Sequence, residues 1–113
     1  MRVRVRVIGD EIDGAARPWV ERRLHDAFGL LASSVLRVVV RVEGSGEVRG
    51  GRAACCIEAH LRPAGSVLVF ETGRDAQEAA ERAIDAASTA VSERLRHAKV
   101  TLRGATPAML HRA

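Results

Sequence analysis

Residues 75–99, DAQEAAERAIDAASTAVSERLRHAK, carry apolar side chains at intervals of three and four positions along the whole stretch. This spacing predicts an amphipathic helix of about seven turns with one buried face. Asp75 is a typical N-cap residue, and Glu78 stands where it can complete a capping box. Acidic residues gather near the start and basic residues near the end, which complements the helix dipole. We expect this helix to cover one face of a sheet formed by the preceding residues.

Three consecutive strands are expected before this helix, at 35–43, 52–62 and 66–72. A loop with four glycines at 44–51 and a tight turn at 63–65 join them as antiparallel neighbours. The run at 66–72 is too apolar throughout to assign its faces. In the other two strands the alternation predicts the inward residues Leu36, Val38, Val40, Val42, Ala53, Cys55, Ile57, Ala59 and Leu61.

The N-terminal stretch 2–8, RVRVRVI, alternates strictly and predicts a half-buried strand with valines on one face and arginines on the other. Apolar residues at helical spacing then predict a helix over 16–32, with Pro18 in its first turn. The expected order is β-α-β-β-β-α. This order predicts a two-layer α+β domain, similar to double-stranded-RNA-binding domains, with a four-stranded mixed sheet and both helices on one face. The first strand should lie parallel to its neighbour through a right-handed crossover.

Size and composition favour one small domain with an anionic partner. The chain has 113 residues, and we expect a domain at 1–100 followed by a mobile tail at 101–113. Its net charge is +4, and every basic residue except Lys99 is an arginine, a side chain suited to phosphate groups.

Neither a membrane helix nor a signal peptide is expected. The only cysteines, Cys55 and Cys56, are adjacent and unsuited to a disulfide, so the expected compartment is the cytoplasm.

Two segments resemble the ribosome hibernation-promoting factor family, also called ribosome-associated inhibitor A or sigma-54 modulation proteins. Residues 16–24, ARPWVERRL, are similar to the first helix of that family. Asp75, Ala79, Glu81 and the pair Ile84–Asp85 are similar to positions of its second helix. The chain resembles a diverged short form. The resemblance implies a factor that occupies the channel for messenger and transfer RNA on the small ribosomal subunit and inhibits translation under stress or in stationary phase.

Basic side chains on the solvent sides of the helices would then contact ribosomal RNA. The implied RNA-binding residues are Arg17, Arg22, Arg23, Arg94, Arg96 and Lys99. A possible second basic patch lies on the open face of the sheet and comprises Arg4, Arg6, Arg37 and Arg41, in the same row as Arg2. Residues 75–99 contain five acidic and four basic side chains. This balance leaves weak binding, binding through another face and loss of the role all open.

The expected partners are the small ribosomal subunit and its RNA, and the chain is expected to be a monomer or weak dimer. No membrane, cofactor, metal ion or small-molecule substrate is expected. One alternative is a diverged protein-interaction module that uses a sheet edge or the tail. Another is a small enzyme, because Cys56, Glu58 and His60 share a strand face. We expect no enzyme, because a flat open sheet offers neither a cleft nor oxyanion donors.

Overall fold

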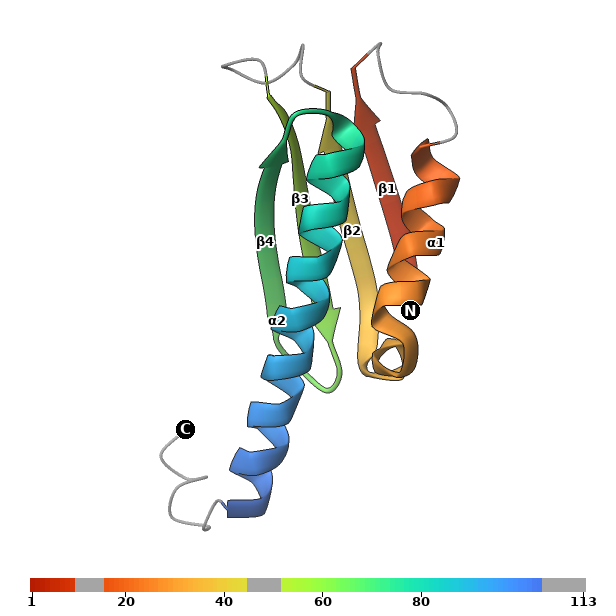
Figure 1. The fold of residues 1–113 in the computed structure, drawn as a ribbon. Coiled ribbons are helices and arrows are strands. Elements are labelled where there is room, and N and C mark those ends of the chain that lie inside the picture. The colour runs from red at the N-terminus through yellow and green to blue at the C-terminus, as the bar shows by residue number, and fades with distance from the viewer. Residues whose placement is uncertain (10–15, 45–51, 105–113) are drawn as a thin grey trace.

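The computed structural model describes residues 1–9, 16–44 and 52–104, with 98–104 described as helix backbone only. Four strands and two long helices follow one another in the predicted β-α-β-β-β-α order (Figure 1). A 3₁₀ segment, η1, follows the first helix. The elements are β1 (Arg2–Ile8), α1 (Ala16–Phe28), η1 (Gly29–Ser34), β2 (Val35–Glu43), β3 (Ala53–Leu61), β4 (Ser66–Gly73) and α2 (Ala76–Gly104).

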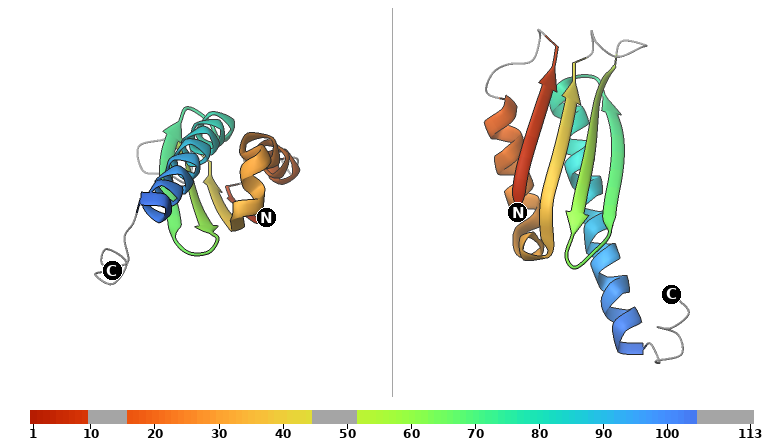
Figure 2. Two further views of the ribbon diagram at one scale, coloured as in Figure 1. Left: turned by 90° about the horizontal axis from the view of Figure 1, so that it is seen from below. Right: turned by 180° about the vertical axis from the view of Figure 1, so that it is seen from behind.

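The strands form one sheet in the order β1-β2-β3-β4. β1 pairs with β2 in parallel, whereas the pairs β2–β3 and β3–β4 are antiparallel. Both helices lie on the same side of this sheet, and its other side is open (Figure 2). The predicted α+β architecture is therefore confirmed.

The core lies between the sheet and the helices. α2 packs chiefly on β3 and β4, while α1 lies beside it over β1. The two helices are also joined where the Ser88 hydroxyl donates a 3.0 Å hydrogen bond to the carbonyl of Ala27. Trp19 is half-buried against this core. The fully buried residues include the predicted β3 set Ala53, Cys55, Ile57, Ala59 and Leu61, together with Val20, Leu24, Phe28, Ala79, Ala83, Ile84, Ala87 and Val91.

The first helix ends earlier than predicted. α1 stops at Phe28 rather than near residue 32, and the chain continues as η1. Gly29 adopts a φ of +47°, in the left-handed region that glycine tolerates and that commonly terminates a helix. Helical spacing alone missed this end because Leu31 still packs against the core from the 3₁₀ segment.

The start of β2 also differs from the prediction. Val35 pairs with Leu61 and Arg37 with His60, so a bulge between them interrupts the alternation. Val35 is consequently 1% exposed, whereas Leu36, expected to face the core, is 47% exposed. Beyond the bulge the predicted inward valines of β2 are buried.

The structure assigns the faces of β4, which the sequence left open. Cross-strand pairing places Val69 beside the buried Ile57 and Phe70 beside Cys56. Val67 and Val69 therefore pack toward the helices. Leu68 and Phe70 point to the open face and are 68% and 64% exposed.

The start of α2 is held by an extended version of the predicted cap. The backbone N–H of Glu78 donates to Asp75 Oδ1 at 2.8 Å, as expected for an N-cap. The Glu78 carboxylate, however, accepts from the backbone N–H of Arg74 at 3.2 Å and from its guanidinium at 3.0 Å, not from Asp75. At its other end α2 continues to Gly104, past the expected boundary at 100, and the rest of the expected tail lies outside the described residues.

Gly73 allows β4 to turn directly into α2. A Cβ atom at this position would lie 2.5 Å from the backbone nitrogen of Ala79. Backbone atoms cannot rotate away as a flexible side chain can, so a larger residue must displace the helix or the strand. The absence of a side chain at Gly73 therefore sets how closely α2 approaches the sheet.

We expect Gly73→Ala to lower the free energy of unfolding by at least about 2 kcal/mol, because the added methyl overlaps the helix backbone. Denaturant unfolding followed by circular dichroism measures this change. Gly29→Ala is the control, since a Cβ there meets no atom within 4 Å and only the left-handed conformation costs about 1 kcal/mol. A Gly73→Ala variant no less stable than Gly29→Ala would contradict the close approach.

We expect the Glu78 cap to make stability depend on pH. The backbone N–H and guanidinium of Arg74 hold the pKa of Glu78 below its ordinary value of 4.5. Its stabilising effect is thus complete above about pH 4.5 and lost as the pH falls through the lowered pKa of the folded state. Glu78→Gln should unfold at a lower temperature than wild type at pH 7, and this difference should shrink in acid. Gln77→Ala, in the same helical turn, should keep the wild-type pH dependence.

Candidate functional site

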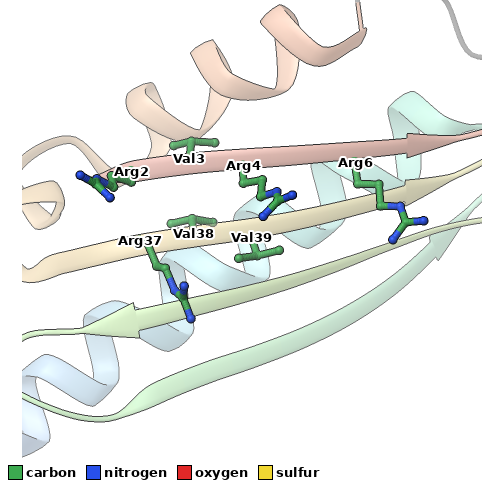
Figure 3. A pocket seen from close by; sticks show the side chains of 7 residues that line it. All are labelled: Arg2, Val3, Arg4, Arg6, Arg37, Val38 and Val39. Atoms are coloured by element: carbon green, nitrogen blue, oxygen red, sulfur yellow. The ribbon is translucent and has the colours of Figure 1, made fainter.

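The open face of the sheet carries a row of arginines on β1 and β2. The parallel register places Arg2 opposite Arg37 and Arg6 opposite Arg41, with Arg4 opposite Val39. A shallow hollow of about 560 Å³ lies over these strands (Figure 3). Its lining consists of Arg2, Val3, Arg4, Arg6, Arg37, Val38 and Val39. Three residues of the predicted second basic patch, Arg4, Arg6 and Arg37, thus line one hollow together with Arg2. The fourth, Arg41, stands opposite Arg6 and is not part of the lining.

Most of the arginines in this patch have no ion-pair partner among the described residues. Arg41 Nε lies 2.8 Å from Glu43 Oε1. Arg2, Arg4, Arg6 and Arg37, by contrast, have no carboxylate within 4.0 Å among the described residues. Like charges directly opposite each other on neighbouring strands repel and lower stability. A bound anion would remove this repulsion.

Polar and apolar side chains share the other half of the open face. His60 Nε2 lies 2.6 Å from Glu58 Oε1 on β3, although the two atoms do not have hydrogen-bond geometry. Across the next strand pair, Leu68 stands opposite Glu58 and Phe70 opposite Cys56. The open face thus changes from cationic at β1 and β2 to apolar at β4. The sequence missed Phe70 as a surface residue because all four positions from Val67 to Phe70 are apolar.

The helix-side arginines form two separate groups. Arg17 and Arg22 are exposed on α1, and Arg23 beside them is half-buried. Arg94 and Arg96 are exposed in the C-terminal half of α2, where the Arg94 guanidinium lies beside Gly65 of the β3–β4 turn. This turn is at the opposite end of the sheet from the start of α1 (Figure 1). The structure therefore does not bring all the predicted RNA-binding residues together, and it describes only the backbone of Lys99.

The acidic start of α2 is largely engaged in internal contacts. The carboxylate of Glu78 pairs with Arg74 at 3.0 Å and lies 3.6 Å from Arg82. Arg82 also donates a 3.3 Å hydrogen bond to the carbonyl of Thr72 on β4. None of Arg17, Arg22, Arg23, Arg94 and Arg96 has an ion-pair partner within the described part of the chain. These five arginines thus present charge that no described carboxylate cancels.

The catalytic alternative finds no support in the geometry. Cys56 and His60 share the open face as expected, but four residues of strand separate them by about 13 Å, beyond proton-transfer distance. Burial raises the pKa of the neighbouring Cys55 thiol to about 12, and Cys55 faces the core. The described histidine, cysteine and carboxylate side chains form no group of three that could hold a metal ion. No helix among the described elements is long and apolar enough to cross a membrane.

Comparisons with known proteins find similarity in structure only, since neither a family model nor a curated protein sequence matches the chain. The N-terminal domain of Protein Y from Thermus thermophilus is similar, with a TM-score of 0.66 and 28% identity over 82% of this chain and 98% of that one. A ribosomal subunit interface protein from Coxiella burnetii is also similar, with a TM-score of 0.71 and 14% identity over 85% of this chain and 99% of that one. Almost the whole of each neighbour is matched, so the shared fold is a complete domain.

We expect only one of the two thiols to react in the folded protein. At a pKa of about 12, roughly one Cys55 thiol in ten thousand is ionised at pH 8, and its sulfur is also buried. Titration with an aromatic disulfide reagent at pH 8 should therefore modify Cys56 alone. Cys56→Ser should remove the reaction until denaturant is added. Rapid modification of folded Cys56→Ser would contradict the burial of Cys55.

Proposed function

We propose a ribosome-binding function, because the chain has the fold of the ribosome hibernation-promoting factor family, to which both structural neighbours belong. The resemblance found in the sequence is thereby confirmed at the level of structure. In finer detail, we propose that the chain binds ribosomal RNA of the small subunit, inhibits translation under stress or in stationary phase, and acts in the cytoplasm as a monomer or weak dimer.

The observation that carries this proposal is the extent of the structural match. The sheet and both helices together cover 98% of the Thermus domain, and the sequences are 28% identical. The second neighbour is a protein of the ribosomal subunit interface. These neighbours are ribosome-associated factors and not enzymes, which favours a binding function for this chain.

The proposed contacts are phosphate contacts made by arginine. Each guanidinium can donate two parallel hydrogen bonds to phosphate oxygens and remains charged at any physiological pH. Arg17 and Arg22 project from α1 without a described carboxylate partner, so binding need not first break an internal ion pair. Arg23 lies beside them, half-buried. Such contacts position a protein on RNA without reading its sequence.

The second proposed contact region is the C-terminal part of α2, with Arg94 and Arg96 exposed near the β3–β4 turn and, by its place in the sequence, Lys99. The α1 group and this region lie at opposite ends of the helical layer (Figure 1). The chain can therefore reach two separate RNA segments. Inhibition then requires no chemical step: a rigid domain held at two points excludes other ligands from the space that it fills.

We expect Arg17→Glu/Arg22→Glu to weaken co-sedimentation with small ribosomal subunits by about tenfold or more, since two attractions to phosphate become repulsions. Arg52→Glu/Arg62→Glu changes the net charge equally at two exposed positions at the ends of β3 and is the control. The measurement is the fraction of protein pelleting with subunits of its own host at increasing salt.

Equal losses in both variants would indicate non-specific attraction and contradict the α1 contact. Wild-type protein that stays in the supernatant at about 100 mM salt would refute ribosome binding itself.

A further inference from the structure

We propose that the open face of the sheet is a binding site for single-stranded RNA, in which arginines of β1 and β2 hold the phosphates and Phe70 of β4 stacks on a base. The site lies on the side of the sheet opposite to the helices and is separate from the contacts proposed for ribosome binding. It does not depend on that proposal.

The spacing of the arginines suits an extended polynucleotide backbone. Arg2, Arg4 and Arg6 occupy alternate positions of β1, and residues two apart on a strand are separated by about 6.6 Å. Successive phosphates of an extended single strand are a similar distance apart. Arg37 on β2 stands opposite Arg2, and its side chain borders the same hollow (Figure 3). Because the long arginine side chains of β1 can reach over the neighbouring strand, a backbone lying over β2 would meet about one cation per nucleotide.

The charge balance of this face favours a polyanion. Among the described residues, the carboxylates on the open face are Glu43, paired with Arg41, and Glu58, close to His60. Neither lies within 4.0 Å of Arg2, Arg4, Arg6 or Arg37. Two of these arginines, Arg2 and Arg37, stand directly opposite each other and repel. Phosphates placed between them would convert this repulsion into paired attraction.

The width of the face matches the length of a nucleotide. β2 and β4 are two strands apart, which corresponds to about 9.6 Å. This distance is similar to that from a phosphate to the far edge of its base. One row runs from Arg6 and Arg41 through the small side chain of Cys56 to Phe70. A base directed away from the arginines would therefore reach the exposed ring.

These features favour a single strand over a duplex or a second copy of the chain. A duplex keeps its bases stacked, so an aromatic ring on a flat sheet could contact only unpaired bases. A second copy on this face would bury several arginines, while its own open-face carboxylates, Glu43 and Glu58, are already close to Arg41 and His60. Single-stranded RNA supplies both the charge and the free π-faces.

The test is fluorescence anisotropy of a labelled ten-nucleotide RNA without self-complementarity, measured at several salt concentrations. We expect Arg4→Gln/Arg37→Gln to weaken binding about tenfold or more and to reduce the salt slope by about 1.4, as expected for two lost phosphate contacts. Arg52→Gln/Arg62→Gln removes the same charge at the ends of β3 and should change both quantities less. Without RNA, Arg4→Gln/Arg37→Gln should melt at the wild-type temperature or higher, since it relieves repulsion.

Loss of the stacking contact of Phe70 should affect the affinity for RNA but not its salt dependence. We expect Phe70→Ala to weaken binding about fivefold or more while leaving the salt slope unchanged. Phe70→Trp should retain wild-type affinity. Leu30→Ala removes an apolar side chain that is 97% exposed on η1, outside the open face, and should have no effect.

Three results would overturn the inference: equal losses in the two arginine pairs, equal affinity for a duplex of the same length, or a wild-type dimer in sedimentation that Phe70→Ala dissociates without affecting RNA binding. The ribosome proposal fails separately. Protein that pellets with ribosomes but does not bind the oligonucleotide refutes the sheet-face site alone, and the opposite result refutes ribosome binding alone.

Discussion

The structure depends on covering only one face of a four-stranded sheet. The inward positions of β2 and β3 are small or β-branched, and α2 meets them with Ala79, Ala83 and Ala87, all fully buried. Small residues on both surfaces let the helix lie close to the sheet, and Gly73 brings its first turn closer still. Since both helices lie on one side, no other element covers the opposite side of the sheet among the described residues. The open face, with its arginines and Phe70, is a direct consequence of this arrangement.

The alternation of inward and outward residues along the strands made much of the fold predictable. Strict alternation in β1 and β3 was enough to identify the inward residues, because a strand has no other way to bury one side. The same reasoning failed at the start of β2, where the bulge turned Leu36 outward. Alternation could not tell which residues of β4 face the core, because four consecutive residues there are apolar. In a bulged or uniformly apolar strand, pairing with the neighbouring strands decides which side chains face the core. The sequence of that strand alone does not determine this pairing.

The candidate site was predictable in composition but not in arrangement. Alternation placed Arg4, Arg6, Arg37 and Arg41 on one face, yet only the parallel register of β1 and β2 shows that Arg2 stands opposite Arg37 and that Glu43 engages Arg41. The helix-side arginines were named individually from the resemblance. Their division into two groups follows from the length of α2, which carries Arg94 to the β3–β4 turn.

The net charge of α2 is a poor guide to whether one end of this helix can contact RNA. Its acidic residues outnumber its basic ones over 75–99, a balance that by itself disfavours contact with RNA. One of these carboxylates, Glu78, is held by Arg74 and lies near Arg82, at the end of α2 that packs on β4. Arg94 and Arg96 lie several turns further along α2, where Arg94 borders the β3–β4 turn. A separation of this size exceeds the screening length of about 8 Å at physiological salt. The proposed phosphate contacts of the basic end would therefore depend on its own surroundings, which include Glu93 beside Arg94, and not on the net charge of the whole helix.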